Sequence, residues 1–404
     1  MESPLSTPLS TVEQVRTLVT GASGYVGSRL VVALLAEGHS VVAASRDPAG
    51  LTRFGWSEDV VPVALDAGDP ASADRAFAEA GPIDVVYYLV HGIGQPDFRA
   101  ADNAAAANLA RSAARAGVRR IVYLGGFVPE DDELSEHLQS RAEVAGSLLV
   151  DGGPELVWLG AAMIIGAGST SFEMLRYVGD RFLLFPLLPW ADNPMDPISV
   201  RDVLYYLVAA ADADRVPAGG YDIRGPATTT YRDLLFTYAR LSGLWRAGLP
   251  IPGVDGALGS ARQRLVTALV SRATALALPV PGGLASDLVE SLDHPMRASE
   301  KLLADVVPDP PGGLTKTGDA IMASLAESTP RPVTELADPH HLADTDDGWA
   351  GGDTLRLRRL AMAVTPPPLH PVLRLVDLVP GPVAGVLRTG LDLLTDLATK
   401  EGYA

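Results

Sequence analysis

The stretch Gly21-Ala-Ser-Gly24-Tyr-Val-Gly27 follows an apolar run, Val15–Thr20, and opens a helical pattern over Tyr25–Glu37. Residues without a Cβ allow a tight turn and let a pyrophosphate approach the backbone, with its phosphates on free N–H groups at the positive end of the helix. The stretch therefore predicts a dinucleotide-binding turn between the first strand and the first helix. The alternative is a glycine turn that serves only the packing of helix on strand.

Short β-rich runs and helical patterns continue to alternate after this turn, which is typical of a parallel sheet with crossover helices. The expected later strands are Ser40–Ala44, Val60–Leu65, Ile83–Val90, Arg120–Leu124, Leu156–Leu159 and Tyr221–Arg224. These runs are apolar on both faces, as expected when helices cover both sides of the sheet. The sequence predicts an α/β fold, a Rossmann-like doubly wound parallel sheet, with a smaller, mainly helical substrate lobe and a helical C-terminal extension.

The composition changes along the chain suggest an order of domains. We expect a flexible tail at 1–13 and the dinucleotide-binding domain at 14–225. Residues 166–200 of that domain contribute to the substrate lobe, and the rest of the lobe is expected at 226–330. An exposed acidic linker at 331–350 and a helical extension at 351–404 follow.

The overall composition excludes several classes of protein. The chain has 404 residues, no cysteine and a formal net charge of −17. Disulfides and cysteine nucleophiles are therefore excluded, and general binding to nucleic acid or to an anionic membrane is disfavoured. The first residues do not resemble a signal peptide, and no uncharged apolar run is long enough for a transmembrane helix. We expect a cytoplasmic protein.

The end of the second strand indicates which dinucleotide is bound. Sites specific for NAD place an acidic residue there, whereas this chain has Ser45 and Arg46, a hydroxyl and a guanidinium that suit a 2′-phosphate. Asp47 comes one position too late. The sequence favours NADP(H), with NAD(H) as the alternative, and Asp66 after the third strand is a candidate for the adenine amino group or a plain turn residue.

Several segments together resemble a known family. The GASGYVG turn, the loop Tyr88-Leu-Val-His-Gly92 and the segment Ala161-Ala-Met-Ile-Ile-Gly166-Ala-Gly168 are similar to those of atypical short-chain dehydrogenase/reductases. The group that they resemble most is the bacterial NAD(P)-binding proteins with an NmrA-like or complex I accessory-subunit-like domain. The resemblance covers about residues 14–245 and implies a Rossmann-like NAD(P)-binding protein.

The resemblance also implies a set of cofactor contacts and a structural asparagine, Asn108. The expected cofactor-binding residues are Gly21, Ser23, Gly24, Tyr25, Val26, Gly27, Ser45, Arg46, Asp66, Val90, His91, Gly92, Gly125, Gly126, Phe127 and Arg141.

The active-site pattern departs from that family. Members that transfer hydride carry a Tyr-x-x-x-Lys pair on the helix after strand five and a Ser or Thr at the end of that strand. This chain has His137 and Arg141 at the helix positions, which share one helix face, and Gly125 or Gly126 at the strand end. Histidine can act as a general acid near neutral pH, so His137 is the candidate proton donor and Arg141 the candidate cofactor contact. The alternative is a solvated helix face.

Three functions remain open at this stage. They are an NADP(H)-dependent oxidoreductase of unknown substrate, a non-catalytic NADP(H) binder such as a redox sensor or assembly factor, and an isomerase or epimerase with tightly held cofactor. The pair His340-His341 lies among aspartates but lacks fixed ligand spacing, so we expect no metal there. The C-terminal helices either pack on the core or make a peripheral contact with a membrane or a protein partner.

Overall fold

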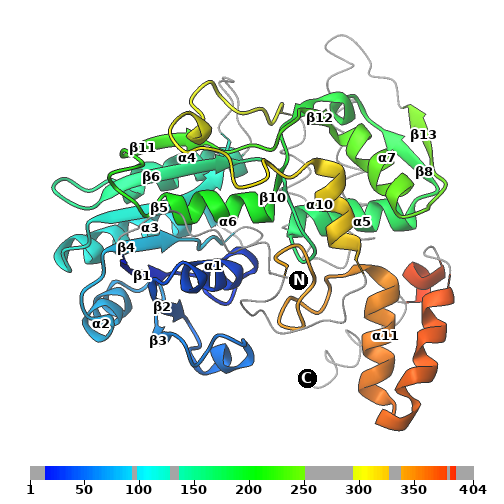
Figure 1. Cartoon of the computed structure of the whole chain (residues 1–404), viewed down its shortest axis with the longest axis horizontal. Helices are drawn as coiled ribbons and strands as arrows, with labels where there is room; N and C mark the ends of the chain where they lie inside the picture. Colours follow the sequence, from blue (N-terminus) through cyan, green and yellow to red (C-terminus); the bar gives the residue numbers. More distant parts are fainter. Residues whose placement is uncertain are drawn as a thin grey trace.

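The computed structural model describes residues 14–92, 98–127, 136–250, 294–326, 338–379 and 383–387. It consists of a lobe built on one large sheet and a smaller lobe beyond the carboxyl ends of its strands (Figure 1). The expected tail at 1–13 and part of the expected substrate lobe, 251–293, lie outside the described residues.

The large sheet is parallel and has seven strands in the order β11-β6-β5-β4-β1-β2-β3. Its strands are β1 (Arg16–Val19), β2 (Ser40–Ser45), β3 (Val61–Ala64), β4 (Val85–Tyr88), β5 (Arg120–Gly126), β6 (Glu155–Ala161) and β11 (Gly219–Asp222). The chain runs outward from β1 to β3 and then returns to β4 on the other side of β1. The sheet therefore reverses its strand order beside β1, the place where sheets of this kind bind ligands. The predicted doubly wound fold is confirmed.

Helices cover both faces of the sheet, and alternate residues of each strand point to one face or the other. Val19 and Tyr87 pack with α1 (Tyr25–Ala36) and α6 (Val200–Ala209). Leu18 and Tyr88 pack on the other face. The helices on that face are α2 (Pro70–Ala80), α3 (Phe98–Arg115) and α4 (Glu136–Leu148).

The smaller lobe has its own apolar core, formed by α5 (Thr170–Arg181), α7 (Tyr231–Leu241) and α10 (Thr317–Leu325). Three pairs of short strands complete it and join it to the sheet lobe. The pairs are β7 (Ile164–Ile165) with β10 (Ile198–Ser199), β9 (Pro194–Met195) with β12 (Thr229–Thr230), and β8 (Leu184–Leu187) with β13 (Ala247–Pro250). Short 3₁₀ helices occur at η1 (Ala49–Arg53), η2 (Pro189–Asp192) and η4 (Leu303–Asp305).

Residues 338–350 are packed into the molecule, so the expectation of an exposed linker is wrong for this part of the segment. Arg29 of α1, itself 3% exposed, makes two hydrogen bonds of 2.9 and 2.7 Å to the carboxylate of Asp346. Its guanidinium also donates to the carbonyl groups of Pro339 and His341. One of the charges that suggested a solvated linker, the Asp346 carboxylate, is instead paired with a buried arginine.

The C-terminal extension consists of α11 (Gly352–Val364) and the 3₁₀ helix η5 (Pro367–Leu378), which pack against each other. Asp353 at the start of α11 pairs with Arg181 of α5 at 2.6 and 2.8 Å, and the Asp353 side chain is 1% exposed. This pair fixes the base of the extension on the smaller lobe. Among the described residues, no helix is long and apolar enough to cross a membrane.

Asp346→Ala tests the contribution of the buried ion pair to stability. Because the variant leaves the Arg29 guanidinium buried without its carboxylate, we expect the free energy of unfolding to fall by about 3–5 kcal/mol. Asp192→Ala removes the exposed pair with Arg232, whose side chains are 56% and 37% exposed, and should cost at most about 1 kcal/mol. Urea unfolding followed by circular dichroism measures both. Equal losses in the two variants would contradict the structural role of Asp346.

Candidate functional site

The turn between β1 and α1 has a conformation that requires its glycines. Gly21 has a φ of +64°, in the left-handed region, and its carbonyl oxygen accepts a hydrogen bond of 2.9 Å from the Gly24 N–H. A Cβ on Gly27 would lie 2.1 Å from the same oxygen. The turn is therefore tight because α1 begins in contact with the backbone that precedes it.

The first turn of α1 presents its N–H groups without a capping side chain. Gly24 occupies the N-cap position, has no side chain to offer and is exposed, while Ser23, Tyr25 and Val26 are half-buried around it. The first N–H groups of a helix have no partner within the helix, and the helix dipole makes this end positive. These features suit a pyrophosphate, in agreement with the geometry that the sequence predicts for this turn.

Tyr25 lies under the loop that follows β7. The Arg29 guanidinium carbon lies 4.1 Å from the centre of the Tyr25 ring, and a Cβ on Gly166 would lie 2.0 Å from the Tyr25 hydroxyl. Burial raises the pKa of Tyr25 well above its ordinary value, although the charge of Arg29 opposes the shift. This phenol is therefore protonated and held in place by packing at neutral pH.

The ends of β2 and β3 carry the residues expected near the adenosine half of the cofactor. Ser45 is half-buried and its hydroxyl accepts a hydrogen bond from the Asp47 N–H, while Arg46 is exposed. Asp66 accepts a hydrogen bond of 2.9 Å from the Gly68 N–H through one carboxylate oxygen. That oxygen holds the turn after β3, which is the role of a turn residue.

Asn108 of α3 joins the same turn, since its side-chain amide donates to the carbonyl groups of Ala67 and Gly68 at 3.4 Å. This contact gives the asparagine a structural role of the kind that the resemblance implies.

The loop after β4 is held by an aspartate that the sequence analysis did not single out. The Gly92 N–H donates a hydrogen bond of 2.7 Å to Asp102 of α3, and burial raises the pKa of that carboxyl group. Val90 packs on the core beside this loop. Burial and then the charge of Arg141 lower the pKa of His91. His91 is therefore neutral near pH 7.

The two glycines at the end of β5 differ in what surrounds them. A Cβ on Gly125 would lie 2.6 Å from Nε1 of Trp158 and 3.0 Å from the ring of Tyr123, whereas the nearest atoms to a Cβ on Gly126 would be at 3.8 Å. Packing therefore excludes a side chain at position 125 and leaves room for one at 126. Phe127, the next residue, is 1% exposed and packs in the interior.

Arg141 lies beside the end of β5. Its Cγ is one of the atoms that would contact a Cβ on Gly126, and its backbone carbonyl accepts a hydrogen bond of 3.4 Å from the Tyr123 hydroxyl. His137 precedes it by one turn of α4, and the side chain of His137 lies outside the described part of the structure. The structure thus brings Arg141 to the candidate cofactor site together with His91, Gly92 and Gly126.

Ser199, His340 and Asp338 form a hydrogen-bonded series that spacing along the chain does not suggest. The Ser199 hydroxyl lies 2.7 Å from Nε2 of His340, and Nδ1 of His340 lies 2.8 Å from Asp338. This arrangement resembles the order of a hydrolase triad. Ser199 and His340 are only 2% and 3% exposed, and the serine also accepts the Arg201 N–H at the start of α6. We therefore assign these residues to anchoring the 338–350 segment.

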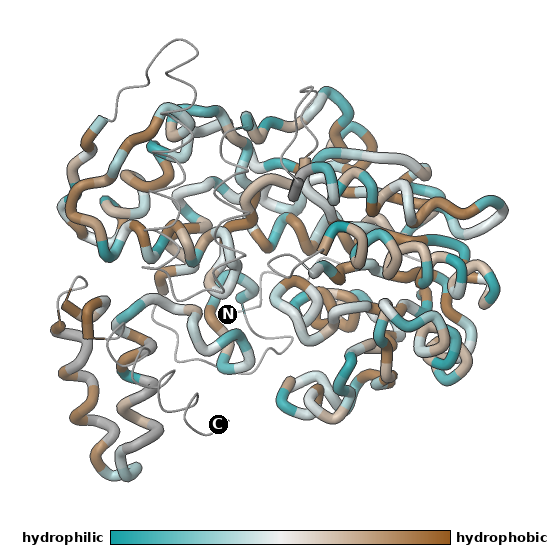
Figure 2. Tube along the Cα trace, turned by 180° about the vertical axis from the view of Figure 1, so that it is seen from behind, coloured by the Kyte–Doolittle hydropathy of each residue, from teal (hydrophilic) through white to brown (hydrophobic). Residues whose placement is uncertain are grey.

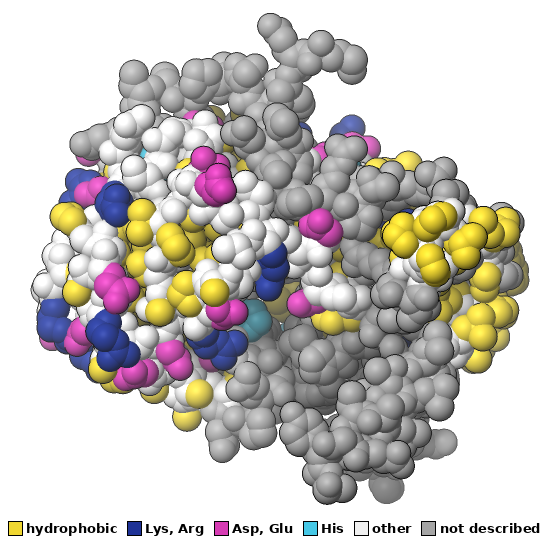
Figure 3. Space-filling model, turned by 90° about the horizontal axis from the view of Figure 1, so that it is seen from below, with side chains coloured by type: hydrophobic (Ala, Val, Ile, Leu, Met, Phe, Trp, Pro, Cys, Tyr) yellow, Lys and Arg dark blue, Asp and Glu magenta, His cyan; other side chains and the backbone are white. Residues whose placement is uncertain are grey.

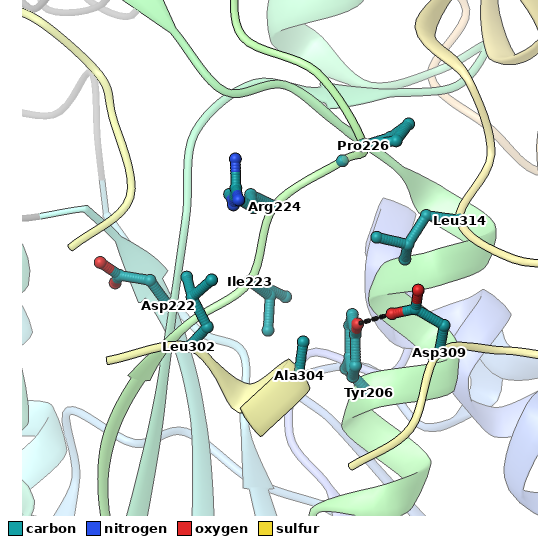
Figure 4. Close-up of a pocket in the computed structure, with 10 residues that line it drawn as sticks. Tyr206, Asp222, Ile223, Arg224, Pro226, Leu302, Ala304, Asp309 and Leu314 are labelled. Atoms are coloured by element: carbon teal, nitrogen blue, oxygen red, sulfur yellow. Dashed lines mark hydrogen bonds between the residues drawn. The ribbon is translucent and has the colours of Figure 1, made fainter. Parts of the chain in front are cut away.

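A cavity of about 340 Å³ lies on the flank of the sheet lobe, beside α6 and the end of β11 (Figure 4). At its base the Tyr206 hydroxyl donates a hydrogen bond of 3.4 Å to Asp309. Its other lining residues are Asp222, Ile223, Arg224, Gly225, Pro226, Leu302, Ala304 and Leu314. None of these is a predicted cofactor contact, so the cavity is separate from the residues around the glycine turn.

Comparison with known proteins identifies an NAD(P)H-binding domain. Residues 21–151 match the family model described as NAD(P)H-binding. An uncharacterised protein of Mycobacterium tuberculosis is 28% identical over 228 residues, which are 56% of this chain and 23% of that protein. The chain thus spans about a quarter of the length of this relative.

Two solved structures have the same fold. A nucleoside-diphosphate-sugar epimerase from Staphylococcus aureus matches with a TM-score of 0.57 and 15% identity, covering 76% of this chain and 99% of that one. The triphenylmethane reductase of Citrobacter sp., complexed with NADP(H), matches with a TM-score of 0.54 and 16% identity, covering 76% of this chain and 98% of that one. At these identities the likeness concerns the fold alone.

Gly125→Ser and Gly126→Ser test the packing at the end of β5. The first variant places its Cβ against the rigid rings of Trp158 and Tyr123, so we expect a loss of about 1–3 kcal/mol in the free energy of unfolding. The second has open space and should change stability by at most about 0.5 kcal/mol. Chemical denaturation compares them directly, and equal stability of the two variants would show that the strand end is less tightly packed than described.

Proposed function

We propose that the chain belongs to the atypical short-chain dehydrogenase/reductase superfamily, through its NAD(P)H-binding domain, and that it is an NADP(H)-dependent oxidoreductase acting on a small molecule. The observation that carries the proposal is the three-glycine turn with the uncapped start of α1 behind it, at the position where the strand order of the sheet reverses. A peripheral contact of the C-terminal helices with a membrane or protein is a separate proposal.

The choice of NADP(H) over NAD(H) rests on the end of β2. An exposed arginine follows directly after this strand, where a carboxylate would accept the ribose hydroxyls of NAD. Arg46 offers a planar guanidinium with several donors, which suits a phosphate group. Asp47 takes part in the turn that follows β2, because its backbone N–H donates to the Ser45 hydroxyl and its carboxylate lies beside Gly50.

The proposed chemistry is reduction of a carbonyl or an activated double bond. The bound cofactor supplies the hydride. His137, one turn before Arg141 on α4, gives the proton to the reduced substrate, and Arg141 binds ribose hydroxyls or phosphate beside Gly126. Arginine remains charged and takes no part in a proton relay.

A non-catalytic NADP(H)-binding sensor or assembly factor is the second candidate. It is favoured by the absence of the Tyr-x-x-x-Lys pair and by the packing around Gly125, which leaves no room there for a serine hydroxyl. An isomerase or epimerase with tightly held cofactor is the third, because the same fold serves a nucleoside-diphosphate-sugar epimerase. Absorbance at 340 nm distinguishes the reductase from the other two, since only the reductase consumes NADPH when substrates are supplied.

Titration calorimetry with NADPH and NADH tests the choice of cofactor. Hydrogen bonds to a charged group contribute about 1.5–3 kcal/mol, so we expect NADPH to bind roughly 10-fold or more tightly. Arg46→Ala should remove this difference, while Arg75→Ala, an exposed arginine of α2, should keep it. Equal affinities for both nucleotides in the unchanged protein would defeat the assignment.

His137→Phe and Arg141→Ala test the proposed catalytic roles. Loss of a general acid should lower turnover by about 10²–10⁴-fold while leaving the affinity for NADPH nearly unchanged. Arg141→Ala should do the reverse and mainly weaken cofactor binding. Turnover of the unchanged protein should fall as the pH rises through the histidine pKa, about 6.5 when unperturbed, because the neutral ring no longer has the proton to give. A pH profile unchanged by His137→Phe would favour the non-catalytic binder.

A further inference from the structure

The loop after β4 is fixed at both of its ends. At its start the Leu89 N–H donates a hydrogen bond of 3.0 Å to the hydroxyl of Thr20, which directly precedes the glycine turn. At its end the Gly92 N–H donates a hydrogen bond of 2.7 Å to Asp102 of α3. The loop is therefore held between the glycine turn and α3, and the two residues between these fixed points are both expected cofactor contacts.

Asp102 differs from the carboxylates on the surface of the sheet lobe. Those lie among arginine side chains, as in the exposed pairs Asp74–Arg115 and Asp84–Arg119, and Figure 3 shows charges of both signs over one face of this lobe. Asp102 is only 8% exposed and forms no ion pair in the part of the chain that the structure describes. Burying a carboxylate without a paired cation costs free energy unless hydrogen bonds compensate it. The Gly92 N–H supplies such a bond, and the carboxylate in turn fixes the loop.

Arg141 acts on the same carboxylate from the end of β5. Burial raises the pKa of Asp102, whereas the hydrogen bond from Gly92 and then the charge of Arg141 lower it. Both groups thus favour the ionised form of the carboxylate against the cost of its burial. Asp102 lies between the loop after β4 and the arginine beside Gly126, two parts of the candidate cofactor site.

The place of the loop in the sheet indicates which half of a dinucleotide it would contact. β2 and β3, with the residues expected near adenosine, lie on one side of β1, and β4 and β5 lie on the other. A dinucleotide lies across such a reversal of strand order, with its two halves on opposite sides. The loop after β4 is therefore on the nicotinamide side. α3, which carries Asp102, packs on the face of the sheet opposite α1 and α6, the face turned toward the viewer in Figure 2.

We propose that Asp102 is a positioning residue for the nicotinamide half of the cofactor, because it holds the Gly92 N–H, and with it His91, in the conformation that binds the dinucleotide. This inference rests on the proposed function, since it requires NADP(H) to bind at the glycine turn. The operative contact is the hydrogen bond to the loop. A loop without this bond has to be ordered when the cofactor binds, and such ordering lowers affinity.

Two ligands that share the adenosine half distinguish positioning from a general loss of structure. NADPH reaches both sides of β1, whereas adenosine 2′,5′-bisphosphate reaches only the side of β2 and β3. In titration calorimetry Asp102→Ala should bind NADPH roughly tenfold or more weakly, the effect of losing a hydrogen bond to a charged group, and should bind the bisphosphate with unchanged affinity. Asp102→Asn keeps an oxygen acceptor for the Gly92 N–H and should restore most of the affinity for NADPH.

Asp74→Ala is the matched control. This carboxylate of α2 also contacts α3, through Ser112 and Arg115, but it is about half exposed and lies away from the loop. Its loss should leave both affinities unchanged. If circular dichroism shows that Asp102→Ala does not fold, Asp102→Ser replaces it, because the serine oxygen ends one bond short of the carboxylate oxygens.

Three results would overturn the proposal. They are an unchanged affinity of the alanine variant for NADPH, an equal loss of affinity for NADPH and the bisphosphate, and a failure of asparagine to restore binding. If the unchanged protein binds neither ligand, the proposed function itself is wrong and this inference falls with it.

Discussion

At the turn between β1 and α1, a Cβ on Gly27 would lie 2.1 Å from the carbonyl oxygen of Gly21, and this close approach requires a glycine where α1 begins. It brings the start of α1 against the end of β1, so the N–H groups of the first helical turn face the carboxyl edge of the sheet. The strand order reverses beside the same strand, so the loops after β2 and β4 leave on either side of this positive helix end. The turn therefore places one candidate anion-binding position at the edge of the sheet where the candidate cofactor residues gather.

Segments from the second half of the chain stabilise this arrangement from outside the sheet. Arg29 follows the turn by less than one helical turn and binds Asp346, which lies 317 positions further along the chain. The carboxylate, two backbone carbonyl groups from the same segment and the ring of Tyr25 surround one guanidinium, so its charge is compensated although it is buried. His340 joins this segment to the start of α6 through Ser199. The beginning of α1 is thus part of a buried polar network as well as a candidate phosphate site.

Packing at the end of β5 also bears on the chemistry that the site can perform. The indole of Trp158 and the ring of Tyr123 occupy the space that a side chain at position 125 would need. The strand end offers no hydroxyl, and the helix that follows has histidine and arginine in place of the tyrosine and lysine of the related reductases. His137 is the proton donor only in the proposed mechanism. The neighbouring tyrosines serve the core, since burial raises the pKa values of both Tyr88 and Tyr123.

The sequence by itself determined which segments form strands, the glycine turn and the class of cofactor, because each depends on residues that are neighbours along the chain. Alternating apolar runs predict strands, and the spacing Gly21, Gly24, Gly27 predicts a turn that a pyrophosphate can approach. The tertiary structure alone decided that residues 338–350 are buried, that Asp102 holds the loop after β4 and that position 125 has no room for a serine. The physical reason is the same in all three cases. An aspartate in a polar segment is solvated unless a cation or an N–H group from a distant part of the chain pairs with it. A glycine is required for space only when a distant side chain fills the space that its own side chain would need. Such contacts leave no periodicity or spacing in the sequence that could predict them.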